Sequence, residues 1–233
     1  MKIWNSAILI NKRRLTPSVM LMRFKLSSKK SHIPGQYYSL KVNLESSEGV
    51  RDYSATNKPN KKGELEFAVE LLKNGEVSPV LHRLKLGNKI EIKGPLGSHF
   101  NIESKNKNLV LIAGGTGIAP FISAIKAYRR QNILLITSFN NEANIPYYKT
   151  ITKLKKQNTN FEVFITLTKN LDKDWKGPTG RITQKTLNLF KNELLHKDSK
   201  IFICGPSAFV KAMEKSLAKL RINEEKIKVE YFG

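Results

Sequence analysis

The sequence predicts a two-domain protein: an N-terminal antiparallel Greek-key β-barrel, then a C-terminal domain with a parallel sheet and helices on both faces. Three observations support this. The 233 residues allow one or two domains at roughly 100–200 residues each. Short alternating runs fill the first hundred residues, and after about residue 101 buried-type strands alternate with helical stretches. We therefore expect one domain over residues 1–103 and a second over residues 104–233.

Turn signals separate the predicted strands of the first domain. Many short strands divided by glycine- and proline-containing turns are typical of a small barrel. The strands are expected at residues 7–10, 19–26, 37–42, 65–71 and 89–92. The turns are expected at residues 34–35, 57–63, 74–75, 86–88 and 94–95, and one helix at residues 79–86.

The second domain has a different pattern. Strand and helix candidates alternate, which is typical of a parallel sheet covered on both faces. The strands are expected at residues 109–113, 133–137, 161–167, 200–204 and 226–229. The helices are expected at residues 120–130, 147–157, 183–195 and 207–220. The polar segment at residues 101–108 is the best candidate for an interdomain linker.

Composition excludes several classes of protein and site. Hydrophobic residues make up 40% of the chain, enough for a folded core. Cys204 is the only cysteine, which excludes an internal disulfide, a cysteine-rich zinc site and a four-ligand iron–sulfur cluster within this sequence. A lone thiol needs no oxidising compartment, so we expect a cytoplasmic protein. The longest apolar stretch, residues 109–125, is broken by glycines and is shorter than the ~20 residues of a spanning helix, so we expect no membrane span.

The chain is strongly basic, with 41 Lys and Arg against 19 Asp and Glu, a net charge of +22. Both domains share the surplus: residues 1–103 carry 18 against 9 and residues 104–233 carry 23 against 10. Such a surplus fits a solvated surface, docking to an acidic protein, or nucleic-acid binding. No zinc finger, helix-turn-helix or aromatic-interleaved basic motif is present, so we expect no nucleic acid. The other two interpretations stay open, and we expect a monomer.

The strongest motif is the glycine-rich run that follows the strand at residues 109–113. It reads Gly114-Gly115-Thr116-Gly117-Ile118-Ala119-Pro120, and a helix begins at once. Glycines let the backbone approach a phosphate, and a helix N-terminus offers N–H groups and a positive dipole end. Pro120 is comfortable in a first helical turn, although it stands where the third glycine of the Rossmann fingerprint would be. The alternative is a plain tight turn.

Four further motifs carry groups that suit a cofactor. Arg51 and Tyr53 alternate onto one face of an extended segment, and Ser54 follows them. A cation and an aromatic ring so close together suit a ligand with a phosphate and a flat ring. The remaining three motifs are Gly75-Glu76-Val77-Ser78, with Ser78 as a helix N-cap, Cys204-Gly205-Pro206 after a buried strand, and Glu230 with Phe232 near the end. Taken singly, each is also compatible with a surface cluster, a turn or core packing.

In this order and spacing, the motifs resemble the ferredoxin–NADP reductase superfamily. The matching elements are Arg-x-Tyr-Ser, Gly-x-x-Ser, Gly-Pro-x-Gly at residues 94–97, the glycine-rich run and Cys-Gly-Pro, and they cover essentially the whole chain. Residues 75–82 and the ending at residues 230–233 are most similar to bacterial single-chain flavin reductases without an iron–sulfur domain.

The resemblance implies an FAD-binding barrel and an NAD(P)-binding domain. It implies that Arg51 pairs with the flavin pyrophosphate, that Tyr53 packs on the isoalloxazine, and that Ser54 forms a hydrogen bond near N5. It places Cys204 by the nicotinamide, with Glu230 and Phe232 closing the flavin face. Ser54, Cys204 and Glu230 are thereby the implied residues of the reacting centre. Further cofactor contacts are implied for Gly75, Val77, Ser78, Gly115, Thr116, Gly117, Pro120, Ser138, Arg181, Gly205 and Pro206.

The implied activity is hydride transfer from NAD(P)H to FAD and release of electrons to a separate acceptor, with no metal required. Because this sequence lacks cluster ligands, we expect an acidic carrier such as a ferredoxin or flavodoxin, or a haem protein. The alternative enzymatic function is a flavin or quinone reductase with a small-molecule acceptor. The non-catalytic alternative is a basic nucleic-acid-binding module. FMN is the alternative to FAD, because no motif in the sequence is specific for the adenine of FAD.

The choice between NADH and NADPH is ambiguous in the sequence. By the resemblance, NADP-preferring relatives carry Arg or Lys two residues after Ser138, where this chain has Asn140. No acidic residue ends the strand to hold an NAD ribose. Arg181, in a later loop, is a candidate for the missing cation. The pattern leans slightly to NADH.

Overall fold

The fold is described from a computed structural model that covers residues 3–28, 31–169 and 174–232. The chain divides into two compact units, each described by itself. The first comprises residues up to Asn101 together with Ala119–Ala127, and the second comprises Ile102–Ile118 and the chain from Tyr128 onward. The first unit therefore includes a helix that the sequence analysis placed in the second domain.

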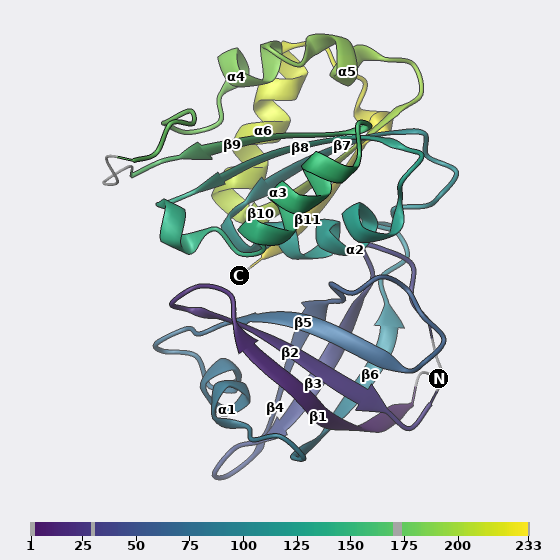
Figure 1. The fold of residues 1–233 in the computed structure, drawn as a ribbon, viewed down its shortest axis with the longest axis vertical. Coiled ribbons are helices and arrows are strands. Elements are labelled where there is room, and N and C mark those ends of the chain that lie inside the picture. Colours follow the sequence, from purple (N-terminus) through teal and green to yellow (C-terminus); the bar gives the residue numbers. More distant parts are fainter. Residues whose placement is uncertain (1–2, 29–30, 170–173, 233) are drawn as a thin grey trace. The chain divides into compact units, whose positions relative to one another are not determined.

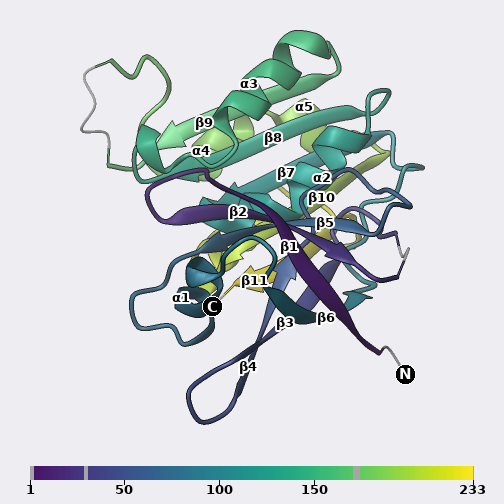
Figure 2. The same cartoon turned by 60° about the horizontal axis from the view of Figure 1, so that its bottom comes forward.

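The first unit is an antiparallel barrel of six strands with one short helix. The strands are β1 (Trp4–Arg14), β2 (Val19–Leu26), β3 (Tyr37–Asn43), β4 (Glu48–Ser54), β5 (Glu64–Glu70) and β6 (Lys89–Leu96), and the helix is α1 (Val77–Arg83). The order β4-β3-β6-β1-β2-β5 inserts β6 between β3 and β1, as a Greek key does (Figure 1). A bridge between Ala55 and Phe67 joins the two edge strands and closes the barrel. Figure 2 shows the long β3–β4 hairpin.

Alternating side chains fill the barrel. From Met22 to Leu26 in β2, buried and exposed residues alternate, because successive side chains of a strand point to opposite faces of the sheet. The rings of Phe24, Tyr38 and Phe67 are fully buried, and Phe67 contacts the other two at centroid distances of 6.2 and 5.8 Å. The core therefore joins β2, β3 and β5, as a closed sheet requires.

Three local predictions for the barrel were wrong. The helix runs over Val77–Arg83 rather than residues 79–86, so Ser78 lies in the first turn and Glu76 takes the N-cap position. The predicted turn at residues 94–95 lies inside β6, where the Gly94–Pro95 peptide is cis and the pairing with β3 shifts register. Proline cannot donate to the ladder, and a register shift accommodates it. Finally, β4 is a full strand, although no strand was predicted for these residues.

The second unit contains a parallel sheet with the order β11-β10-β7-β8-β9. Its strands are β7 (Asn108–Gly114), β8 (Asn132–Phe139), β9 (Phe161–Leu167), β10 (Ser199–Pro206) and β11 (Ile227–Phe232). Its α-helices are α3 (Tyr148–Gln157), α4 (Gln184–Asn188), α5 (Lys191–Leu195) and α6 (Ser207–Lys219). Leu187, Leu194 and Met213 of α4, α5 and α6 pack on one face of the sheet, and Figure 1 shows α3 on the other.

Tertiary packing changes two predicted helices. The stretch at residues 183–195 forms two short helices instead of one, because the chain breaks at Phe190, whose ring packs edge-on against Phe164 at 5.5 Å. The helix predicted at residues 120–130 is α2 (Ala119–Ala127) and ends three residues earlier. In the polar segment at residues 101–108, Ile102 is fully buried and its carbonyl accepts the Tyr128 hydroxyl at 2.6 Å. No helix among the described residues is long and apolar enough to cross a bilayer.

His32 is buried in the barrel unit, and only 5% of it is exposed. Its Nε2 lies 3.2 Å from both the Asn57 carbonyl oxygen and the Ser123 hydroxyl. Burial lowers the pKa of His32 from 6.5 to about 4, and the hydrogen bond to the Asn57 carbonyl only partly opposes this. The imidazole is therefore neutral in the folded protein at neutral pH.

This shift predicts acid sensitivity. Between pH 6.5 and pH 4 the unfolded chain binds a proton at His32 that the folded chain does not, so the free energy of unfolding falls as pH is lowered through this window. The loss attributable to His32 is about 3 kcal/mol. Denaturant titrations at pH 7 and pH 4 should show that the parent loses about that much more stability than His32→Gln. Equal losses in the two proteins would contradict the assignment.

Candidate functional site

On the barrel, β4 presents Arg51 and Tyr53 on the same side of the strand. Arg51 is exposed, and its Nη1 donates to the Val50 carbonyl at 2.8 Å. No carboxylate pairs with it among the residues that the structure describes. Burial raises the pKa of Tyr53 to about 12, and nearby Arg51 acts in the opposite direction, so the phenol stays neutral. An exposed guanidinium beside a half-buried aromatic ring fits a ligand with a phosphate and a flat ring.

Helix α1 lies beside this strand, with Val77 close to Gly49. A Cβ on Gly49 would lie 2.6 Å from Val77 Cγ2, so a larger residue would require this contact to shift. Gly75 forms the preceding turn, where its N–H donates to the Leu72 carbonyl at 3.0 Å. The first-turn N–H groups of Val77 and Ser78 have no intrahelical acceptor. The structure thus brings α1 close to the strand that carries Arg51.

Two serines of the barrel lie deeper than these groups. Ser54, at the end of β4, is 7% exposed and pairs in register with Tyr37. Ser78 is 5% exposed, and its hydroxyl accepts the Leu72 N–H at 3.1 Å. Ser78 therefore stabilises the turn before α1.

In the second unit, the glycine-rich run forms the turn after β7. Gly115 has φ +57° with open space where a side chain would be, so its conformation requires glycine and leaves room beside the backbone. A Cβ on Gly117 would overlap the Cys204 carbonyl. Thr116 lies between them, half-exposed, in a short 3₁₀ turn (Gly115–Ile118). This turn can approach a phosphate closely, as the motif predicts.

The Cys-Gly-Pro motif lies at the carboxyl end of β10, next to that turn. Cys204 pairs in register with Ala113 of β7 on one side and with Glu230 of β11 on the other, and Pro206 pairs with Phe232. Burial, with the nearby Glu230 carboxyl, raises the pKa of the Cys204 thiol well above its ordinary value, so the thiol stays protonated. The parallel register thus gathers Cys204, Glu230 and Phe232 at one edge of the sheet. Gly233 lies outside the described residues.

The remaining predicted residues divide between the two units. Ser138 is the last residue but one of β8, near its carboxyl end, in register with Gly114 and Thr166. Arg181 is exposed and follows Gly180, whose carbonyl accepts the Thr166 hydroxyl at 2.8 Å. Gly205 lies beside Gly114 in the same edge cluster. Pro120 is buried in the first turn of α2 and belongs to the barrel unit.

Two contributors were missed in the sequence. Gly49 is recognisable in hindsight as a glycine inside a strand, which often marks a close backbone approach. Phe209, in the first turn of α6, gave no signal at all. A Cβ on Gly114 would lie 2.8 Å from Phe209 Cγ, and one on Gly205 would lie 2.8 Å from Phe209 Cδ1. Its ring therefore lies against the carboxyl ends of β7 and β10 at the candidate nucleotide site.

The described residues hold no group of three or more His, Cys, Asp or Glu side chains placed to bind a metal ion. The structure assembles two separate clusters instead. One contains the β4 cation and aromatic ring beside α1, and the other contains the glycine turn beside Cys-Gly-Pro. The first suits a phosphate-bearing aromatic cofactor, and the second suits a nucleotide pyrophosphate.

Comparisons with known proteins match both clusters. Residues 6–102 match the oxidoreductase FAD-binding domain family, and residues 111–215 match the oxidoreductase NAD-binding domain family. NADH-cytochrome b5 reductase 1 of Aspergillus terreus is 30% identical over 230 residues, which are 91% of this chain and 76% of that protein. The anthranilate 1,2-dioxygenase electron transfer component of Acinetobacter baylyi is 30% identical over 204 residues, which are 83% of this chain and 57% of that protein.

A solved structure shares the fold. The flavohem-like FAD/NAD-binding domain of nitric oxide dioxygenase from Vibrio cholerae superimposes with a TM-score of 0.86 at 22% identity. The match covers 98% of each chain.

The barrel cluster predicts a specific role for Arg51. Arg51→Ala should weaken FAD binding about 10- to 100-fold, because it removes a charge-assisted contact to a phosphate. Arg14→Ala is the matched control, since Arg14 is also exposed and also donates to a main-chain carbonyl, that of Pro17. Flavin absorbance retained through dialysis measures the effect. The assignment of Arg51 is wrong if both variants keep FAD as tightly as the parent.

Proposed function

The chain belongs to the ferredoxin–NADP reductase superfamily, and from this premise we propose that its electron acceptor is a separate, acidic one-electron carrier protein. The general activity follows from the family: the chain is an NAD(P)H-dependent FAD oxidoreductase. The identity of the acceptor is the further step. It is supported chiefly by the charge of the chain.

FAD, when bound, supplies the redox chemistry by accepting a hydride from NAD(P)H and passing electrons on. The residues of the chain bind and orient. Arg51 offers charge to the pyrophosphate, Tyr53 offers a neutral aromatic face, and α1 offers first-turn N–H groups. Glycines 115 and 117 let the nucleotide pyrophosphate approach the turn after β7. A hydride carries its own electron pair, so this step needs no general base.

The argument for a carrier protein starts from what the chain contains. One cysteine cannot hold an iron–sulfur cluster, so these 233 residues provide no cluster to take electrons from the flavin. The curated relatives carry names that point to protein acceptors, a cytochrome b5 in one case and a dioxygenase system in the other. A net charge of +22 attracts an acidic partner. A ferredoxin, flavodoxin or acidic haem protein meets these conditions.

Charge attraction predicts strong salt dependence. Electrostatic steering raises association rates by roughly 10–10³ at low salt. It fades as the Debye length falls from ~10 Å at 0.1 M to ~3 Å at 1 M. The kcat/KM for an acidic ferredoxin or flavodoxin should therefore drop steeply over this range. Stopped-flow reduction of the bound flavin by NAD(P)H is the control and should change little. A flat profile with acidic carriers would favour a small-molecule acceptor, such as a quinone or free flavin.

Nucleotide choice is a second, finer proposal, and it favours NADH. Asn140 follows Ser138 at the carboxyl edge of β8, and its side-chain oxygen accepts the Thr168 hydroxyl at 3.3 Å, so an amide stands where a 2′-phosphate would need a cation. Arg181 is exposed, and no carboxylate pairs with it in the part of the chain that the structure describes. We expect kcat/KM for NADH to exceed that for NADPH. A tenfold preference for NADPH that Arg181→Ala abolishes would reverse the proposal and identify the cation.

A further inference from the structure

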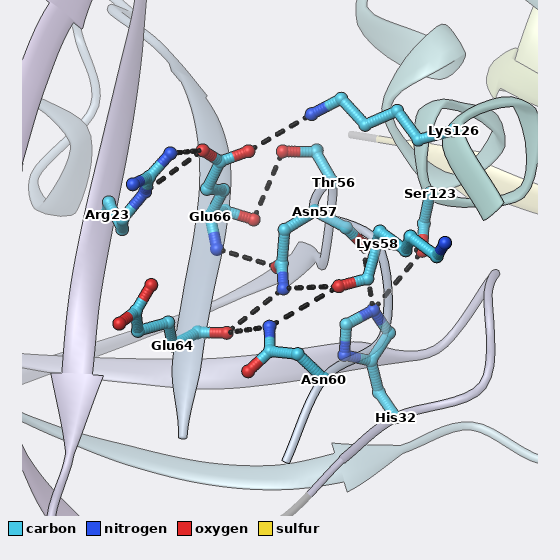
Figure 3. Close-up of polar contacts among 10 residues, drawn as sticks. All are labelled: Arg23, His32, Thr56, Asn57, Lys58, Asn60, Glu64, Glu66, Ser123 and Lys126. Carbon is cyan, nitrogen blue, oxygen red and sulfur yellow. Dashed lines mark hydrogen bonds and ion pairs between the residues drawn. The ribbon is translucent and has the colours of Figure 1, made fainter. Parts of the chain in front are cut away.

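Helix α2 (Ala119–Ala127) links the glycine turn to the barrel unit. It begins immediately after Ile118, the last residue of the turn, with no linker between them. It nevertheless belongs to the barrel unit, where the Phe121 ring stacks on Phe100 at a centroid distance of 5.9 Å. Two buried polar contacts add to this packing, and Figure 3 shows them together.

The first contact is an ion pair at Lys126. Its Nζ lies 3.0 Å from Glu66 Oε2, while Arg23 of the neighbouring strand β2 reaches the other oxygen, Oε1, at 2.5 Å. The Glu66 side chain is only 8% exposed. Burial acts to raise the pKa of Glu66, but Lys126 and Arg23 outweigh it and hold that pKa below its usual value, so the carboxylate is charged. Glu66 and Arg23 both belong to barrel strands, whereas Lys126 reaches the carboxylate from α2.

The second contact lies one turn earlier on the helix. Ser123, fully buried, donates its hydroxyl to the Asn57 carbonyl at 2.8 Å. The Asn57 side chain is held in turn by β5, since its amide donates to the Glu64 carbonyl at 3.0 Å and its oxygen accepts the Glu66 N–H at 2.9 Å. Both contacts therefore converge on Glu66, one through its side chain and one through its backbone (Figure 3).

We propose that Ser123 and Lys126 are positioning residues for nucleotide binding, because they hold α2 on the barrel and thereby fix the end of the glycine turn from which α2 starts. The inference rests on the family assignment, which gives that turn to the pyrophosphate of NAD(P)H. Neither side chain needs to touch the nucleotide. Releasing α2 lets the turn sample more conformations. A smaller fraction of the protein then has the conformation that binds the nucleotide, and the apparent affinity falls by that fraction.

The test compares matched pairs of variants. Lys126→Met removes the ion pair, and Arg23 still neutralises Glu66. Lys41→Met is its control, because Lys41 is also a partly buried lysine that pairs with barrel carboxylates, those of Glu48 and Glu91. Ser123→Ala removes the buried hydroxyl contact. Ser199→Ala is its control, because Ser199 is equally buried and also donates to a main-chain carbonyl, that of Glu193 at 2.5 Å.

Stopped-flow reduction of bound FAD separates affinity from chemistry. Lys126→Met and Ser123→Ala should raise the half-saturating NAD(P)H concentration about 2- to 30-fold, the range for residues coupled to a site they do not touch. Flavin content and the limiting rate should stay near those of the parent. Lys126→Arg should restore most of the affinity, and both controls should match the parent.

The proposal is overturned if Lys126→Met and Ser123→Ala lower the thermal midpoint while their half-saturating concentrations equal those of the controls. It is also overturned if Lys126→Arg restores stability without restoring affinity. If one of the two variants does not fold, the other decides. A parent protein that binds FAD but is not reduced by either nucleotide would instead contradict the family activity, so the two failures are distinguishable.

Discussion

The contact between Gly117 and the Cys204 carbonyl is the constraint on which the nucleotide cluster depends. A single methyl group at residue 117 cannot fit there, so the turn after β7 and the carboxyl end of β10 can approach only as bare backbone. Phe209 fills the adjacent space against Gly114 and Gly205. Because protein interiors are close-packed, these contacts restrict the Gly114–Gly117 part of the turn, whereas its last residue, Ile118, leads directly into α2. The open space beside Gly115 then remains for a ligand.

Features encoded locally were predictable from the sequence. Apolar runs mark β7, β8 and β10, and each of the five strands of the second unit appears in the structure within a few residues of its predicted position. The glycine run was recognisable because a strand, glycines and a helix in that order have few other uses. Five motifs in register along the chain carried the family resemblance, although each was weak alone.

Features that depend on distant partners were not predictable. The break at Phe190 arises because the Phe164 ring, on another element, takes that side chain edge-on. The ion pair between Glu66 and Lys126 joins residues 60 positions apart, and no periodicity reports such a pairing. The start of α1 was misplaced because Ser78 looked like a cap, whereas its hydroxyl accepts the Leu72 N–H from inside the first turn. The first two features depend on residues far apart in sequence, and the third depends on a hydrogen bond across the turn before α1.

The two units hold their functional residues by different physical means, and the difference suits their ligands. Around the glycine turn, backbone atoms and the Phe209 ring pack closely, and burial raises the pKa of the Cys204 thiol, so no charge on that thiol opposes an anionic nucleotide. On β4 the charge of Arg51 is left exposed beside a neutral ring, which suits a cofactor that brings its own anionic phosphates. Immediately after the glycine turn in sequence comes α2, held by a buried carboxylate with a cation on each oxygen. Breaking a buried ion pair on one side leaves an uncompensated charge. With Arg23 and Lys126 both present, Glu66 keeps one cation when the other is lost, so the barrel can keep its fold while its hold on the helix weakens.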